Sequence, residues 1–143
     1  MMKLMRNTIL ALLLCSAVQA EAQPVERAPS AAQLRDWAAG PCIRAANHAG
    51  IDYADALDRA IAEDPRGLAT LFRFTDSGWC DGAAAEGHCV ILFGLLQRWG
   101  DHRFSRALRA QKTPIRKAVF NAVAAFPDFK PTEFPLTNAS QPH

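Results

Sequence analysis

Apolar side chains recur at intervals of three and four residues along most of the chain, a spacing typical of amphipathic helices. Leu57, Ala60 and Ile61, for example, fall on one helical face, while Asp55 and Asp58 fall outside it. Nothing alternates as a half-buried strand does over more than a few residues. Since prolines and glycines divide the pattern, helices are expected over residues 31–39, 41–48 and 82–99. Further short helices are expected to begin at Asp52 or Tyr53, at Pro65, at Asp101 and at Thr113.

The segment Gly82–Trp99 differs from the others because its middle, Cys89–Leu96, is apolar on nearly every side. Such a helix is normally enclosed by other helices. A buried strand is the alternative, but the residues that flank the apolar run favour a helix, and Asp81 is expected to cap it. The predicted fold is all-α, a compact array of about six short helices around a central buried helix, 82–99.

Two parts of the chain resemble one another at an offset of 47 to 49 residues. Leu57–Ile61, followed by Pro65, resembles Phe104–Leu108, followed by Pro114. Two short helices divided by a proline at this period suggest hairpins of the HEAT type. Two amphipathic hairpins that converged on similar residues would give the same pattern, and two copies are too few for a solenoid.

The N-terminus predicts export. Lys3 and Arg6 precede the apolar run Ile9–Leu14, and Val18-Gln19-Ala20 then offers small side chains at the positions that a signal peptidase recognises. Cleavage is expected after Ala20, which places the protein in the periplasm or outside the cell. The expected organisation is a signal peptide (1–20), a flexible leader (21–30), one all-α domain (31–126) and a proline-rich tail without regular structure (127–143).

Beyond the signal, no apolar segment is long enough to span a membrane. The remaining charges are balanced in number but unevenly placed. Residues 21–90 carry six basic and eleven acidic side chains, and residues 91–143 carry eight basic and three acidic ones. The exported chain is therefore expected to be strongly dipolar.

Three cysteines remain after cleavage, and export makes a disulfide plausible. If Asp81 caps the helix, Cys89 lies eight residues further along it, about 12 Å away, whereas bonded cysteines keep their Cα atoms within roughly 4.4–6.8 Å. A Cys42–Cys80 bond is therefore predicted, with Cys89 as a buried thiol. The alternatives are Cys80–Cys89, with a helix that begins near Gly87, then Cys42–Cys89, then three free thiols.

The best local group of chemically active side chains is Asp76, Asp81, Glu86 and His88, which His48 and Cys42 could approach in space. Its spacing matches no zinc or calcium motif. Asp76 and Asp81 are also explained as turn and cap residues, Glu86 as an exposed helical residue and His88 as an interfacial histidine. No cofactor, metal site or catalytic residue is therefore predicted. A small hydrolase with Cys80 as nucleophile and His88 as base is kept as an alternative.

The second feature is a basic stretch over residues 98–117, which holds seven basic side chains and one acid, Asp101. It could bind an acidic protein or an anionic envelope component, although a solvated helix exterior explains it too. Nucleic acid is not an expected partner for an exported chain with few aromatic residues near these charges. The candidate partner-binding residues are Arg103, Arg106, Arg109, Lys112, Arg116 and Lys117.

The order of ALDRAIAEDPRGLATLF, CDGAAAEGH and LLQRWGDHRFSRAL within residues 55–126 resembles a type of small exported helical protein from Gram-negative bacteria. The resemblance implies a periplasmic helical domain and supplies no catalytic residues. The leading hypothesis is a non-enzymatic interaction module that binds another protein, as an inhibitor or immunity-type partner does. The alternatives are the Cys80/His88 hydrolase and an anion or envelope-surface binder that uses residues 98–117.

Overall fold

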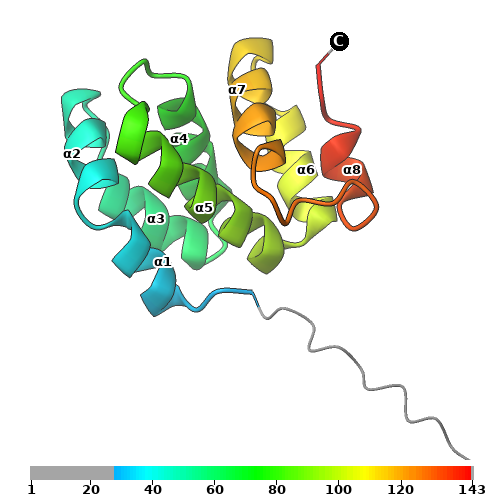
Figure 1. Cartoon of the computed structure of the whole chain (residues 1–143), viewed down its shortest axis with the longest axis horizontal. Helices are drawn as coiled ribbons and strands as arrows, with labels where there is room; N and C mark the ends of the chain where they lie inside the picture. Colours follow the sequence, from blue (N-terminus) through cyan, green and yellow to red (C-terminus); the bar gives the residue numbers. More distant parts are fainter. Residues whose placement is uncertain (1–27, 143) are drawn as a thin grey trace, which may run out of the picture.

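A computed structural model describes residues 28–142, so the predicted signal peptide, its cleavage site and most of the leader lie outside the described residues. The described part is helical and contains no strand, which confirms the all-α prediction. It holds eight helices, compared with the expected six or so (Figure 1). They are α1 (Ala31–Ala38), α2 (Pro41–His48), α3 (Tyr53–Ile61), α4 (Pro65–Thr75), α5 (Gly82–Trp99), α6 (Asp101–Arg109), α7 (Thr113–Ala124) and α8 (Pro135–Asn138).

Local sequence explains most helix starts. The Ser30 hydroxyl accepts a hydrogen bond from the Gln33 N–H, and the Gln33 side chain binds the Ser30 N–H in return, which is a capping box. Asp52 and Asp64 cap α3 and α4 through their carboxylates. Asp81 is in the cap position of α5, but its side chain makes no capping hydrogen bond, so that part of the prediction is wrong.

Helix α5 is the centre of the fold and packs against α1, α2, α6 and α7 (Figure 1). Every residue from Ile91 to Leu96 is buried, as its all-round apolar pattern predicts. At its end, the Trp99 indole N–H donates to the Ala60 carbonyl of α3 over 2.8 Å. This bond satisfies the one polar group of a large buried ring.

The two segments that resemble each other in sequence pack differently. Helices α3 and α4 form a close pair, in which Gly67 of α4 lies against the backbone of α3 at Ala56 and Ala60. Helix α7 instead packs mainly against α4 and α5, and it touches α6 less. The related sequences thus fill equivalent buried positions without forming two equal hairpins.

The prediction that residues 127–143 lack regular structure is wrong at α8. Pro135 can begin a helix because the first helical position needs no N–H donor. The Asp101 carboxylate supplies the missing acceptors, since it binds the N–H groups of Leu136 and Thr137, each over 2.7 Å. Asp101 itself is the first residue of α6, so one side chain connects the starts of two helices.

Among residues 28–142, no helix combines the length and the apolar character needed to cross a bilayer.

Candidate functional site

The predicted group of Asp76, Asp81, Glu86 and His88 is not assembled as a site. The three carboxylates are exposed, whereas the His88 side chain is completely buried in the core. Within the described part of the chain, no three His, Cys, Asp or Glu residues are grouped so that they could hold a metal ion. His88 instead lies at the interface of α5 with α3 and α4, because α5 turns it inward, away from the carboxylates.

His88 is held by hydrogen bonds at both ring nitrogens. Its Nδ1 lies 2.7 Å from the Tyr53 hydroxyl, and its Nε2 lies 2.9 Å from the Thr75 hydroxyl. Because the Thr75 hydroxyl donates its proton to the Leu71 carbonyl over 3.2 Å, it accepts from Nε2–H. Nδ1 is then the acceptor for Tyr53. Burial lowers the pKa of His88 to about 3, so the ring is neutral at pH 7.

Three thiols lie around this network, and none of them is bonded to another. Cys42, Cys80 and Cys89 are all free, so the predicted Cys42–Cys80 disulfide is absent from the structure. The Cys42 thiol instead donates to the Ala84 carbonyl of α5 over 3.5 Å. It also lies against Gly87, where a Cβ atom would be 3.0 Å from its sulfur. Cys89, expected to be buried, is only partly so.

The thiols are also poor nucleophiles. Burial raises the pKa of Cys80 to about 12, and burial likewise raises the pKa values of Cys42 and Cys89. A cysteine hydrolase needs a thiolate activated by a neighbouring base. Both nitrogens of His88 are occupied by Tyr53 and Thr75, which leaves neither for Cys80. The arrangement around Cys80 and His88 is that of a packed polar core.

The basic stretch does not form one uniform surface. Arg103 pairs with Glu63 over 2.9 Å and lies over the Trp99 ring, with its guanidinium carbon 4.8 Å from the ring centroid. Arg109 binds the Ser140 hydroxyl and the Leu136 carbonyl, so it holds α8 in place. Arg116 is half-buried. The exposed members with neither an ion pair nor a side-chain hydrogen bond to a described residue are Arg106, Lys112 and Lys117.

A hollow between α3 and α4 is lined by charged residues, including Asp55, Arg59, Arg66 and Arg73. Most of these charges already have local partners. Arg59 pairs with Asp55 over 2.7 Å, Arg66 pairs with Asp64, and the Arg73 guanidinium donates to the Thr70 hydroxyl. The hollow therefore offers little unmatched charge to a ligand.

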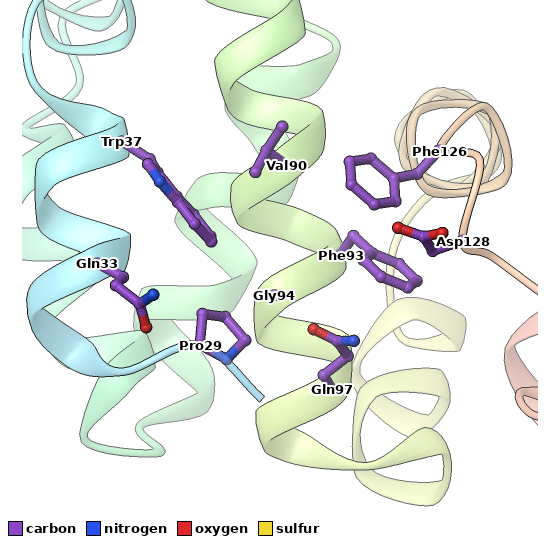
Figure 2. A pocket seen from close by; sticks show the side chains of 9 residues that line it. All are labelled: Pro29, Gln33, Trp37, Val90, Phe93, Gly94, Gln97, Phe126 and Asp128. Atoms are coloured by element: carbon purple, nitrogen blue, oxygen red, sulfur yellow. The ribbon is translucent and has the colours of Figure 1, made fainter. Parts of the chain in front are cut away.

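A groove of about 220 Å³ crosses the outer face of α5, and we call it the aromatic groove (Figure 2). Its floor is α5, one wall is α1 with the residues before it, and the other wall is the segment that follows α7 (Figure 2). The lining residues are Pro29, Gln33, Trp37, Val90, Phe93, Gly94, Gln97, Phe126 and Asp128.

Aromatic side chains define both walls of the aromatic groove. Trp37 leans from α1 toward the floor and is 39% exposed, although the sequence pattern places it on the same face as the buried Leu34. On the other side, the rings of Phe93 and Phe126 stack with centroids 4.5 Å apart. Exposed tryptophan beside stacked aromatic rings is a common composition of recognition surfaces.

Gly94 sets the depth of the floor. A Cβ atom at this position would lie 2.7 Å from Pro29 Cγ and 2.9 Å from Leu34 Cδ2. The absence of a side chain therefore allows the chain before α1 to approach α5 closely. The Arg98 guanidinium fixes that approach, because it donates to the Pro29 carbonyl over 3.1 Å.

Three of the nine residues that line the aromatic groove are polar: Gln33, Gln97 and Asp128. The Gln33 side chain already serves the capping box of α1. Asp128 is exposed and forms no ion pair within residues 28–142. Gln97 lies about one helical turn after Gly94 on α5 and also lines the groove. The result is a groove of mixed apolar and polar lining, with one negative charge on its rim that has no ion pair among the described residues.

Sequence reasoning did not find this groove. Its walls come from residues about 90 positions apart in the chain, and no periodic pattern links Trp37 with Phe126. One signal pointed toward it, a glycine inside the fully apolar segment Cys89–Leu96. Comparison with known family models, with curated proteins and with solved structures found no match in any of the three searches.

Proposed function

We propose that this chain is an exported binding module that recognises a side chain of a partner protein in the aromatic groove and has no catalytic activity of its own. The observation that carries the proposal is the partly exposed Trp37, which faces Phe126 across an apolar floor (Figure 2). Large aromatic residues in concave sites supply much of the affinity at protein interfaces. A role as an inhibitor or immunity-type partner is the form that we favour.

The size of the groove supports a protein ligand. Small-molecule and cofactor sites usually enclose about 300–1,000 Å³. At about 220 Å³ and open to solvent, the aromatic groove has room for one or two side chains of a larger partner. The rest of the interface would be formed by the surfaces around the groove.

The chemistry of the core supports a module without catalysis. The histidine expected to act as a base is neutral, buried and bound at both nitrogens. The pKa of Cys80, at about 12, keeps its thiol protonated at neutral pH. Both features suit a rigid core better than an active site.

The test compares two exposed tryptophans that differ in position. Trp37 lines the aromatic groove, and Trp79, which is 49% exposed, stacks on His48 at the other end of α2. A photo-crosslinking residue placed at Val90 would identify the partner in intact cells, and isothermal titration would then measure its affinity for the purified protein.

The expected result is that Trp37→Ala weakens binding of this partner by about 2 kcal/mol or more, which is the range of an interface hot spot. Trp79→Ala should leave the affinity unchanged. Equal affinity of the Trp37→Ala variant and the unaltered protein would contradict the proposal. A partner that crosslinks to a photo-reactive residue placed at Trp79, but not to one placed at Val90, would also contradict the proposal.

A further inference from the structure

We propose that the residue which enters the aromatic groove is a cation with an apolar stem, that is, an arginine or lysine side chain of the partner. This inference rests on the proposed function, because it concerns the ligand of the same groove. It is carried by the position of Asp128 beside the stacked Phe93 and Phe126 rings (Figure 2).

The first argument is the cost of covering Asp128. Its carboxylate is exposed, lines the groove and has no ion-pair partner among residues 28–142. A neutral occupant would remove water from this charge without replacing it, and an anionic occupant would also repel it. A cationic head group removes the same water and supplies the opposite charge.

The second argument concerns the stem. Trp37 and Phe126 form opposite walls, and Val90 and Gly94 form an apolar floor between them (Figure 2). Lysine and arginine place three or four methylene groups on such a surface while the charged end stays near water. Aromatic faces attract cations in addition. One side chain would therefore satisfy the apolar and the charged parts of the groove together.

The third argument fixes the direction in which the side chain lies. Arg98 is bound to the Pro29 carbonyl, so a positive charge is present near the Pro29 end of the groove. A cationic head group is repelled there and attracted to Asp128 on the opposite wall. We therefore place the charged end beside Asp128 and Phe126, and the backbone of the partner over α1.

The experiment uses three capped tripeptides, Ala-Xaa-Ala, in which Xaa is arginine, norleucine or glutamate. Norleucine keeps an unbranched apolar stem and removes the charge. Binding is followed by the NMR shifts of the Trp37 indole N–H and the Gly94 amide, which report on the groove itself. Titrations are repeated with Asp128→Asn and with Asp36→Asn, an exposed acid of α1 that does not line the groove.

We expect the arginine peptide to bind about tenfold more tightly than the norleucine peptide, and the glutamate peptide to bind most weakly. Asp128→Asn should reduce the affinity for the arginine peptide by about threefold to fivefold. It should tighten binding of the norleucine peptide, because a neutral occupant then no longer covers an unpaired charge. Asp36→Asn should change neither affinity. The preference for arginine should decrease as salt is added.

Other outcomes separate the two proposals. If norleucine or glutamate binds as tightly as arginine, the cationic ligand is wrong, while the groove remains a protein-binding site. If no peptide shifts Trp37 or Gly94, both proposals are wrong. If the protein forms a dimer that Trp37→Ala dissociates, the occupant is a second copy of the chain and the cationic ligand is again wrong.

Discussion

The Tyr53 hydroxyl donates a hydrogen bond of 2.7 Å to Nδ1 of His88, in a part of the core that is closed to solvent. The two residues come from α3 and α5, so the bond connects the first half of the chain with the central helix. It also keeps the imidazole in one neutral form, because Nδ1 can accept this bond only without a proton of its own.

The stability of the protein should decrease as the pH falls from about 6.5, the ordinary pKa of histidine, toward 3. The pKa of His88 is about 3 in the folded protein, so below 6.5 the unfolded chain binds a proton that the folded one does not. The loss from this residue approaches about 1.4 kcal/mol per pH unit. Urea unfolding at several pH values would measure it.

The matched variant for this measurement is His88→Gln, which keeps hydrogen-bonding groups but does not titrate. Its pH slope between 6.5 and 3 should be shallower than that of the unaltered protein. NMR of the unaltered protein gives a second readout, in which the His88 ring should show no titration above about pH 4. An His88 signal that titrates near pH 6.5 would contradict the prediction.

The three described thiols should react slowly in the native protein. With the Cys80 pKa at about 12, its thiolate is scarce at pH 8, and the pKa values of Cys42 and Cys89 are raised as well. Reaction of Cys80 with a colorimetric disulfide reagent should be at least about a hundredfold slower than in urea, where its pKa returns toward 8.5. Cys42 and Cys89 should also react more slowly in the native protein than in urea. The unfolded protein is the control. Rapid modification of native Cys80 would restore the hydrolase hypothesis.

Two glycines within helices should respond differently to alanine. A Cβ at Gly67 would lie 2.6 Å from the Ala56 carbonyl oxygen and 2.6 Å from the Ala60 nitrogen, which are backbone atoms of α3. At Gly94 it would meet only side-chain atoms of Pro29 and Leu34. Gly67→Ala should therefore cost about 1–3 kcal/mol of unfolding free energy, and Gly94→Ala should cost less. Thermal or urea unfolding of the pair decides the order.

Removal of the Asp101 carboxylate should release α8. Asp101→Ala loses two hydrogen bonds of 2.7 Å to the N–H groups of Leu136 and Thr137. The loss of a cap costs about 1 kcal/mol, which corresponds to roughly fivefold faster hydrogen exchange at these two amides. Asp101→Asn keeps one acceptor oxygen, so its exchange rate at these amides should lie between those of Asp101→Ala and the unaltered protein. Unchanged exchange in Asp101→Ala would show that packing alone holds α8.

Much of the fold could be predicted from the sequence, because it depends on local signals. The start of α5 at Gly82, the end at Gly100 and the proline starts of α2 and α4 are set by residues within one helical turn. The burial of Ile91–Leu96 also follows directly from composition. The start of α8 escaped prediction because its cap, Asp101, lies 35 residues earlier in the chain.

The chemistry of the candidate sites was harder to predict for a related reason. Spacing placed Cys42 and Cys80 at two helix starts, but it could not show that the Cys42 thiol would find the Ala84 carbonyl as its partner. Likewise, helical spacing places Leu34 and Trp37 together, whereas only the packing of α1 on α5 decides which of them is buried. Such choices depend on contacts between distant segments.

The bond between Asp101 and α8 has an effect beyond the end of the chain. The segment that carries Phe126 and Asp128 leaves α7 at one end and reaches α8 at the other, where Asp101 and Arg109 anchor it to α6. One wall of the aromatic groove is thus attached to the fold at both ends, through α7 and through the contacts of α8 with α6. A chain that stopped before Pro135 would keep every residue of the groove but lose the anchor of this wall on α6, and the Phe93–Phe126 stack would then hold the wall alone.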